Sequence, residues 1–370
     1  MTKPSKKPGE TMRLAVSVGD PSGIGPEVSV KGAALLAKSD PNAHALLVGS
    51  TDAVRAGART MKIAESRIVR VDDPNEAWAR ADGRTIFVWE PTATLAAVDR
   101  KPGKPTKKGG AAQLAWVDAA TDLVTSGRAD ALVTGPVSKK SIAESGVPGS
   151  AKFRGHTEHL GERLGARDTT MAFYSHGLVS TLVTTHLPHA KVARAITKAS
   201  VLRAILHTAW LTKMLGSKAH RACIAVASLN PHAGEGGLLG HEEIDAIAPA
   251  VLAAHEKLRA GRFPDDVEGP IGAETAFRRA QLGFFSAVVA MYHDQATIPM
   301  KMASFGEAVN VTLGLPIVRT SVDHGTAYDA AGKGTADASG MLEALVLGAT
   351  LERRRRLSDA SPRPSSRRTR

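Results

Sequence analysis

Three histidines of this 370-residue chain stand directly after apolar runs, in positions where a parallel sheet commonly holds its chemistry. They are His186, His232 and His293. Neutral imidazole is the commonest metal ligand, and three protein ligands with one open coordination position describe a catalytic divalent metal. Any one of these histidines alone is more typical of a hydrogen-bonded structural residue. Together, at matching strand ends, they predict a metal site assembled from distant parts of the sequence.

Polar residues in the same regions suit an anionic substrate. Lys301, Asn310 and Arg319 follow the last of the three histidines, and an arginine can hold a carboxylate or phosphate through two parallel hydrogen bonds. His156 and Thr157, in "FRGHTEHL", precede an apparent helix whose free N–H groups favour an anion. Each feature also has a simpler interpretation, which is solvated surface charge for the cations and ordinary helix capping for Thr157.

Two glycine-rich stretches resemble ligand loops to different degrees. Residues 321–338, "SVDHGTAYDAAGKGTADA", combine small and polar residues and then open a helix, so their backbone can approach a dinucleotide. This stretch is not the GxGxxG fingerprint, which occurs nowhere in the chain. Residues 19–27, "GDPSGIGPE", lack the GK[ST] ending of a phosphate loop. We interpret them as a tight strand-to-helix turn near the cleft.

Short apolar runs alternate with longer amphipathic ones, which is typical of βαβ units and a largely parallel sheet. We expect strands at 13–18, 44–48, 84–89, 129–134, 178–184, 222–229 and 286–291. We expect helices at 109–126, 198–215, 241–258, 273–281 and 337–349. The polar clusters follow five of the strands, so they predict one functional edge of the sheet.

Composition excludes several other classes of protein. No apolar run is long enough for a membrane span, and the first residues lack the apolar core of a signal peptide. The single cysteine, Cys223, rules out an internal disulfide framework and suits the cytoplasm, and its apolar flanks predict a packing role. Much of the net charge of +12 lies in residues 1–13 and 351–370, so a basic nucleic-acid-binding body is poorly supported.

The motifs, taken in order, resemble the 4-hydroxythreonine-4-phosphate dehydrogenase family of vitamin B6 synthesis. The resemblance covers about residues 13–350. It rests on "VGDPSGIGPE", "TGPVSKK", "FRGHTEHL", "LNPHAGEGG", "MYHDQ" and "VNVTLGLPIVRTSVDHGTAYDAAGKGTAD". One departure is Ala296, which stands where the family usually has glycine and which would narrow the pocket by a methyl group.

The resemblance implies an α/β fold of the isocitrate/isopropylmalate-dehydrogenase type, with two α/β units flanking an active-site cleft. We expect the first unit at 13–135 plus 286–350 and the second at 136–285. Residues 1–12 and 351–370 are expected to be disordered basic tails, which serve either as solubilising segments or as weak polyanion binders. The resemblance also implies a homodimer whose metal ligands are shared between subunits.

The resemblance assigns roles to individual residues. It implies that one divalent ion (Zn, Mg or Co) is held by three histidines, and that NAD or NADP is the second cofactor. Lys301 is a substrate contact and our candidate for the catalytic proton acceptor. The metal ligands are His186, His232 and His293. The substrate contacts are His156, Thr157, Lys301, Asn310 and Arg319. The cofactor contacts lie in the 323–337 loop and are His324, Gly325, Thr326, Ala327 and Asp337.

The activity implied by the resemblance is oxidation of 4-phosphooxy-L-threonine to a β-keto acid, which decarboxylates to 3-amino-2-oxopropyl phosphate in pyridoxal 5'-phosphate synthesis. Two sister activities remain open, on threonate- or erythronate-4-phosphate and on an aromatic cis-dihydrodiol. A phosphate-binding acyltransferase of similar architecture is a third alternative, and it would not need three histidines. A nucleic-acid-binding protein is a fourth, and it predicts salt-sensitive binding that depends on 351–370.

Overall fold

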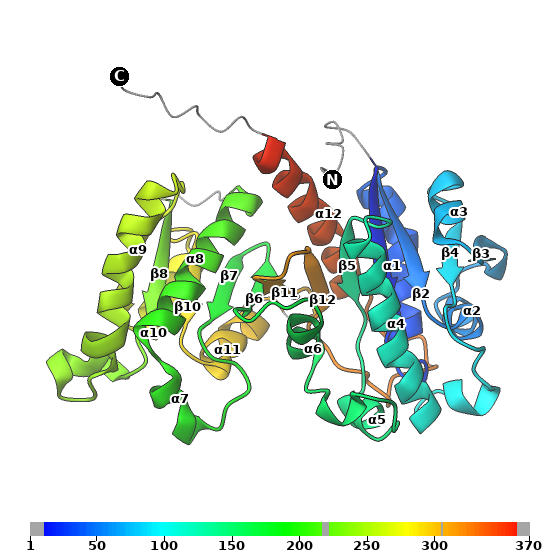
Figure 1. Cartoon of the computed structure of the whole chain (residues 1–370), viewed down its shortest axis with the longest axis horizontal. Coiled ribbons are helices and arrows are strands. Elements are labelled where there is room, and N and C mark those ends of the chain that lie inside the picture. The colour runs from blue at the N-terminus through cyan, green and yellow to red at the C-terminus, as the bar shows by residue number, and fades with distance from the viewer. Residues whose placement is uncertain (1–10, 217–221, 305, 361–370) are drawn as a thin grey trace.

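The fold is built on one large mixed sheet. The structure is a computed structural model that describes residues 11–216, 222–304 and 306–360. Its sheet has 12 strands in the order β3-β4-β2-β1-β5-β12-β11-β6-β7-β10-β8-β9 (Figure 1). The strands are β1 (Met12–Ser17), β2 (Ala43–Val48), β3 (Ile68–Val71), β4 (Ile86–Trp89), β5 (Ala131–Thr134), β6 (Thr170–Ser175), β7 (Leu178–Leu182), β8 (Cys223–Ala227), β9 (Asp266–Ile271), β10 (Ala287–Ala290), β11 (Val309–Leu313) and β12 (Arg319–Val322).

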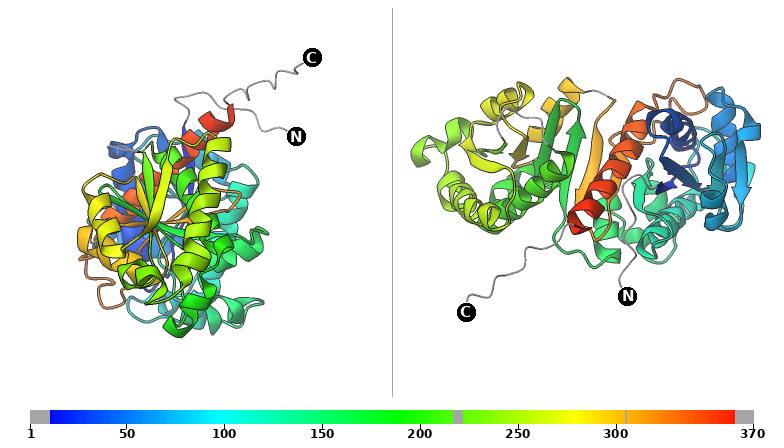
Figure 2. Two further views of the ribbon diagram at one scale, coloured as in Figure 1. Left: turned by 90° about the vertical axis from the view of Figure 1, so that its left-hand side faces the viewer. Right: turned by 90° about the horizontal axis from the view of Figure 1, so that it is seen from above.

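Helices cover the sheet on both faces (Figures 1 and 2). Parallel strands need such crossover helices, and burial on both faces favours continuous apolar strands such as β1, β5 and β8. The helices are α1 (Gly25–Ser39), α2 (Thr51–Thr60), α3 (Pro74–Ala79), α4 (Lys107–Thr125), α5 (Lys139–Ala143), α6 (His156–Arg163), α7 (His189–Ala195), α8 (Lys198–Leu215), α9 (Ala248–Ala260), α10 (Ala273–Gln281), α11 (His293–Ala303) and α12 (Ser339–Ala360).

Two parallel sets of strands are joined by antiparallel strands in the middle of the sheet. From β3 to β12 every neighbouring pair is parallel, and so is every pair from β7 to β9. Strand β11 is antiparallel to β12 and β6, and β6 is antiparallel to β7. The expected α/β class is therefore confirmed, and the two α/β halves share one continuous sheet.

The placement of β10 corrects the expected division of the chain. We expected residues from 286 onward to return to the first unit. Instead β10 hydrogen-bonds to β7 and β8 in the second parallel set, and its own helix α11 packs beside β7. The chain returns to the first set only with β11 and β12, because β12 pairs with β5. The second half thus extends through α11.

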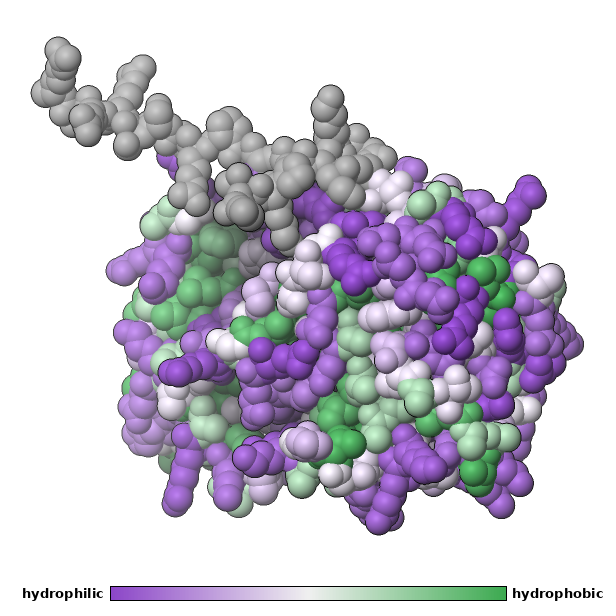
Figure 3. Space-filling view, turned by 45° about the vertical axis from the view of Figure 1, so that its right-hand side comes forward, coloured by the Kyte–Doolittle hydropathy of each residue, from purple (hydrophilic) through white to green (hydrophobic). Residues whose placement is uncertain are grey.

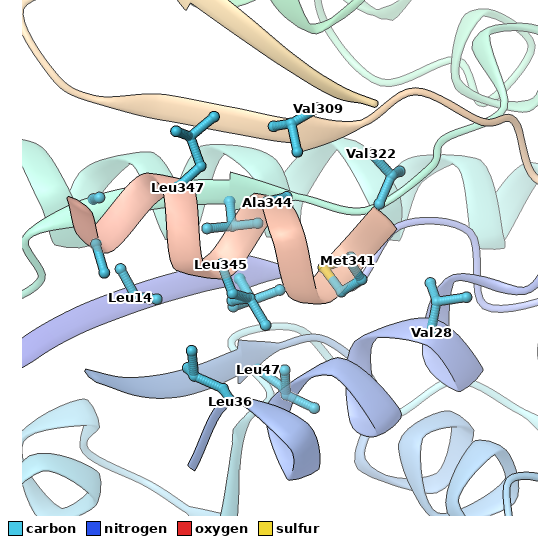
Figure 4. Close-up of a cluster of buried hydrophobic side chains, with 14 of the residues drawn as sticks. Leu14, Val28, Leu36, Leu47, Val309, Val322, Met341, Ala344, Leu345 and Leu347 are labelled. Atoms are coloured by element: carbon cyan, nitrogen blue, oxygen red, sulfur yellow. The ribbon is translucent and has the colours of Figure 1, made fainter. Parts of the chain in front are cut away.

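Helix α12 forms the centre of the first half's core. Its residues Met341, Ala344 and Leu345 are buried against β1, β2 and α1, as the close-up in Figure 4 shows. Leu14 and Leu47 from those strands are also fully buried in this cluster. Seen from above in Figure 2, α12 crosses the middle of the molecule between its two halves.

The expectation of a disordered tail from residue 351 was wrong for residues 351–360. They extend α12, and its run of arginines is bound to three separate parts of the chain. Arg353 Nη2 donates to Asp40 Oδ1 at 2.9 Å, Arg354 Nη1 donates to the Met214 carbonyl at 2.9 Å, and Arg356 Nη2 donates to Asp130 Oδ1 at 2.6 Å. Residues 361–370 lie outside the described residues, as do 1–10.

The surface of the protein is that of an ordinary globular protein. The face in Figure 3 is mostly hydrophilic, with small hydrophobic patches between charged side chains. Within the described residues, none of the helices has the length and apolar character that crossing a bilayer requires. Cys223 is buried and reduced in β8, as expected for a packing residue.

Candidate active site

A buried arginine occupies the centre of the site. Arg319 opens β12, is 3% exposed, and donates from Nη1 to Asn310 Oδ1 (3.2 Å) and Thr312 Oγ1 (2.9 Å) and from Nη2 to Thr134 Oγ1 (2.6 Å). These partners are neutral, and its Nε has no hydrogen-bond partner within the part of the chain that the structure describes. Burial lowers the pKa of Arg319 to about 9, so the side chain still carries its charge at neutral pH. A buried cation with an unused donor is a site for an anion.

The start of α6 lies beside this arginine. His156 and Thr157 occupy its first two positions, and Thr157 Oγ1 lies 3.3 Å from Thr312 Oγ1. His156 Nε2 is buried and unpartnered among the described residues. Burial lowers the pKa of His156 well below its ordinary value, and the nearby charge of Arg319 lowers it further. The imidazole is therefore neutral and can donate to, or accept from, a bound ligand.

Helix α6 is held in place from its other side. His159 Nε2 lies 2.6 Å from Asp118 Oδ1, and Arg163 donates to Asp122 at 2.6 Å. Both carboxylates lie on α4, which packs against β1 and β5. These contacts hold the helix that carries His156 and Thr157 against α4. The part of the site formed by Arg319, His156 and Thr157, which we call the anion end, is therefore fixed in place.

Two of the three predicted metal ligands lie side by side. His186 follows β7, His293 begins α11, and their ring centroids are 5.6 Å apart. Glu158 Oε1 lies 3.6 Å from His186 Nδ1, and Asp294 Oδ1 lies 2.7 Å from His293 Nδ1. Because a carboxylate only accepts, His293 Nδ1 donates to Asp294 and its Nε2 keeps a lone pair for a metal. The longer contact places the Glu158 carboxylate beside Nδ1 of His186, which favours the same tautomer there. The donor chemistry of this pair therefore fits a divalent cation.

His232 is not part of this pair. It is exposed, in a left-handed turn at Pro231–Gly237 in which residues 232–236 all have positive φ. Among the described residues no three His, Cys, Asp or Glu side chains form a metal-binding group. The expected cluster of three histidines is therefore not found among the described residues of one chain, which bring only His186 and His293 together.

Lys301 lies further along α11 and is exposed. It faces a partly buried carboxylate, Asp323, whose pKa is raised by burial and lowered by the nearby Lys301, His293 and His324. The α11 start is itself anchored, because Gln295 accepts from the Met291 amide (2.7 Å) and donates to the Ser228 carbonyl (2.8 Å). The structure thus brings Lys301 to the same side as the histidine pair.

The predicted cofactor loop lies on the turn at residues 19–27. The Thr326 carbonyl accepts from the Ile24 amide at 2.9 Å, and Ala327 has a positive φ of 41°. His324 Nε2 is buried without a partner among the described residues, and space is open where Gly325 would carry a Cβ. An unused imidazole nitrogen beside open space fits a ligand at this loop. Asp337, in contrast, caps α12 by accepting from the Ser339 amide at 2.9 Å.

Two buried carboxylates support this loop from below. Asp20 accepts from Tyr328 Oη at 2.7 Å and from Gln113 Nε2 at 2.9 Å, and burial raises its pKa. Glu27 Oε1 accepts from the Gly332 amide at 2.7 Å. The turn at 19–27 is therefore the platform of the 323–337 loop, which refines its interpretation as a turn near the cleft.

The family model for "Pyridoxal phosphate biosynthetic protein PdxA" matches residues 41–348. The 4-hydroxythreonine-4-phosphate dehydrogenase of Geobacter metallireducens is 40% identical over 352 residues, which cover 95% of this chain and 97% of the relative. This chain belongs to the PdxA family. The expected family is thereby confirmed.

Solved structures of similar proteins agree. The crystal structure of 4-hydroxythreonine-4-phosphate dehydrogenase from Klebsiella pneumoniae has a TM-score of 0.74 at 32% identity, covering 92% of this chain and 100% of that one. A terephthalate 1,2-cis-dihydrodiol dehydrogenase from Burkholderia xenovorans has a TM-score of 0.61 at 29% identity, covering 92% and 98%. The PdxA family and a sister activity thus share this architecture.

Sequence reasoning missed several residues of the site. Thr134 and Thr312 bind Arg319 directly, Glu158 contacts His186, and Asp323 lies near Lys301. Thr134 stands at the end of a predicted strand and Glu158 follows the quoted His156–Thr157 pair, so their positions were a usable signal. Asp323 begins the predicted 323–337 loop, but no role was assigned to it. Thr312 was missed because β11 was not predicted.

Proposed function

We propose that this protein oxidises 4-phosphooxy-L-threonine with NAD or NADP and a divalent metal, giving a β-keto acid that loses carbon dioxide to form 3-amino-2-oxopropyl phosphate. The step would serve pyridoxal 5'-phosphate synthesis in the cytoplasm. The observation that carries the proposal is the buried Arg319, with an unused Nε, beside the paired imidazoles of His186 and His293. Membership of the PdxA family supports the same reaction.

The arginine and the start of α6 would bind one anionic group of the substrate. Arg319 Nε, His156 Nε2 and the Thr157 hydroxyl surround the place where that group would sit, and Asn310 fixes the guanidinium. Lys301 supplies a second, more exposed cation on α11. A phosphorylated hydroxy-amino acid carries two anionic groups, so two separate cationic places match its charge.

His186 and His293 would hold the divalent ion (Zn, Mg or Co) through their Nε2 atoms, with His232 as the third ligand. Because His232 lies away from the pair within one chain, we propose that it comes from the second subunit of a homodimer. A bound divalent cation lowers the pKa of a coordinated hydroxyl group and polarises a neighbouring carbonyl. That is the chemistry it would supply to oxidation and decarboxylation.

The chain's own residues would then orient and deprotonate the substrate. Lys301 Nζ is our candidate to accept the proton of the substrate hydroxyl, after the ammonium group has released its own proton. The nicotinamide cofactor would be held by His324, Gly325, Thr326 and Ala327, with Asp337 at the end of the loop, and it would supply the hydride acceptor. His324 Nε2 is the unused group available for that contact.

Nicotinamide reduction tests the proposal directly. Purified full-length protein is mixed with Co²⁺ or Mg²⁺, NAD or NADP, and 4-phosphooxy-L-threonine, and absorbance of the reduced cofactor is followed with a chelator control. We expect chelator-sensitive turnover of this substrate. Absence of turnover with every substrate and metal, in protein shown to be dimeric, would refute the dehydrogenase assignment.

A second candidate keeps the reaction and changes the substrate. The similarity to the terephthalate dihydrodiol dehydrogenase supports an aromatic cis-dihydrodiol, and threonate-4-phosphate is the phosphorylated alternative. The same assay includes both compounds. Arg319 and Lys301 favour a substrate with anionic groups over an uncharged dihydrodiol, which has no phosphate or carboxylate for them to bind.

A further inference from the structure

Glu158 lies between Arg319, at the anion end of the site, and the histidine pair of His186 and His293, at the metal end. It occupies the third position of α6, directly after His156 and Thr157, and its side chain is about one-third exposed. Oε1 lies 3.6 Å from His186 Nδ1. Glu158 also lies close enough to Arg319 for its negative charge to oppose the lowering of the guanidinium pKa by burial. One carboxylate therefore faces both the histidine pair and the buried arginine.

The packing around Gly155 keeps this carboxylate in place. A Cβ at Gly155 would lie 2.9 Å from Glu158 Oε2 and 3.5 Å from Lys139 Nζ. The absence of a side chain at Gly155 thus lets Glu158 and the ammonium group of Lys139 approach the start of α6 together. Lys139 opens α5, which follows β5 and the Arg319 partner Thr134. The Glu158 carboxylate on α6 therefore lies near Lys139 of α5 and near His186, which follows β7.

We propose that Glu158 is a positioning residue that couples the anion end of the site to the metal end, an inference that rests on the proposed function. At 3.6 Å from Nδ1, the Glu158 carboxylate favours a proton on that nitrogen of His186 and so leaves Nε2 available as the ligand. The same negative charge opposes an anion at Arg319 until a cation is bound. Glu158 thus favours metal binding and disfavours substrate binding to the metal-free enzyme.

This role predicts effects of opposite sign from one substitution. Glu158→Gln keeps the size of the side chain but removes its charge and presents an amide to His186. Metal affinity should fall by roughly 10- to 100-fold, the usual effect of losing a carboxylate that orients a ligand histidine. Affinity for inorganic phosphate in metal-free protein should rise, by about two- to fivefold, because a like charge is removed. General damage to the site would weaken both.

The experiment titrates full-length wild-type, Glu158→Gln and Glu158→Asp proteins with Co²⁺, followed by its visible absorption, and with inorganic phosphate by calorimetry in the presence of chelator. Glu162→Gln is the matched control, because Glu162 lies one turn later on α6 and is exposed. We expect the opposite shifts in Glu158→Gln, a smaller loss of metal affinity in Glu158→Asp, and no change in Glu162→Gln.

The outcomes separate this inference from the proposed function. If wild-type protein binds Co²⁺ and Glu158→Gln binds it equally well, or binds both Co²⁺ and phosphate more weakly, the coupling role of Glu158 is refuted while the reaction stands. If wild-type protein binds no divalent cation at all, the metal-dependent reaction itself is refuted. Circular dichroism of each variant establishes that the compared proteins are folded.

Discussion

The two ends of the site differ in how complete they are within one chain. At the anion end, Arg319 is 3% exposed and three of its hydrogen bonds go to residues of β5 and β11. At the metal end, the side chains of His186 and His293 are 47% and 38% exposed, and the third expected ligand lies elsewhere. The first end is prebuilt by the core of the sheet. We propose that the second end is completed by a metal ion and by a partner subunit.

A large effect should come from one conservative substitution at the prebuilt end. Arg319→Lys replaces a planar group that uses both Nη atoms with one ammonium group, so Thr134, Thr312 and Asn310 cannot all keep their partner. We expect kcat/KM to fall by roughly a hundredfold or more, since losing a buried charged contact costs about 2–5 kcal/mol. Steady-state kinetics checks this, with Arg167→Lys on the exposed surface as the control. Equal activity of Arg319→Lys and wild type would show that no substrate anion binds there.

A complementation experiment tests whether the metal end is completed by a partner. His232→Ala and His293→Ala should each abolish turnover. Co-refolded in equal amounts, they should recover about a quarter of wild-type activity, because half of randomly assorted symmetric dimers contain one intact site. If all three ligands came from one chain, the mixture would stay inactive. The control mixes two preparations of His293→Ala.

The stability of the part of the sheet that carries the anion end should fall in acid. Burial alone would raise the pKa of Asp130, which stands just before β5, but hydrogen bonds from Arg13 and Arg356 lower it to about 2. At pH values above 3.8, which is the ordinary pKa of an aspartate, this depressed pKa stabilises the fold by about 2 kcal/mol. The contribution is lost as the pH falls from 3.8 towards 2. Asp130→Asn should therefore lower the free energy of unfolding at pH 7 and flatten its decline in acid.

Denaturant titrations from pH 7 to pH 3 measure this, with the exposed Asp72→Asn as the matched control. The anion end would share the loss, since β5 carries Thr134. An Asp130→Asn protein as stable as wild type at pH 7 would show that the contacts of Asp130 with Arg13 and Arg356 add nothing to the stability of this part of the sheet.

The smallest effect should come from Ala296, where the family usually has glycine. Its methyl group is fully buried in the cluster with Phe277 and Met300, inside α11, so it fills the core. The expected narrowing of the substrate pocket is not supported by this packing. Ala296→Gly should cost about 1 kcal/mol of stability, because glycine is a poor helix residue, and leave kcat/KM near the wild-type value. A marked change in KM would place the methyl group against the substrate after all.

The sequence was most informative where strands are apolar and least informative where they are polar. All seven predicted strands exist, because runs such as "ACIAVASL" have one dominant interpretation. Strands β3, β6, β9, β11 and β12 were missed. In β9 and β12 the reason is plain, since "DVEGPI" and "RTSV" contain charged or turn-forming residues whose partners lie far away in the sequence. Their pairing is decided by the sheet, which local propensity does not describe.

The same distinction holds for the site. The motifs identified Arg319, His156 and the three predicted metal ligands as candidate site residues. Residue types alone, however, do not distinguish a buried arginine from a solvated one. Only the structure shows that Arg319 has neutral partners and that His232 stands apart from the other two histidines. The prediction of a disordered tail was wrong for a similar reason. "RRRR" has the composition of a disordered segment, but Arg353 binds the half-buried Asp40 and Arg356 binds the buried Asp130.

The position of α12 has a consequence for the synthesis of the protein. The core of the first half contains Leu14 from the first strand and Leu345 and Leu351 from the last helix. While the chain is being made, the strands and helices that precede α12 have no partner for this surface until α12 has left the ribosome. The first half can therefore close only after that point, and until then its apolar face is exposed to chaperones and to other nascent chains.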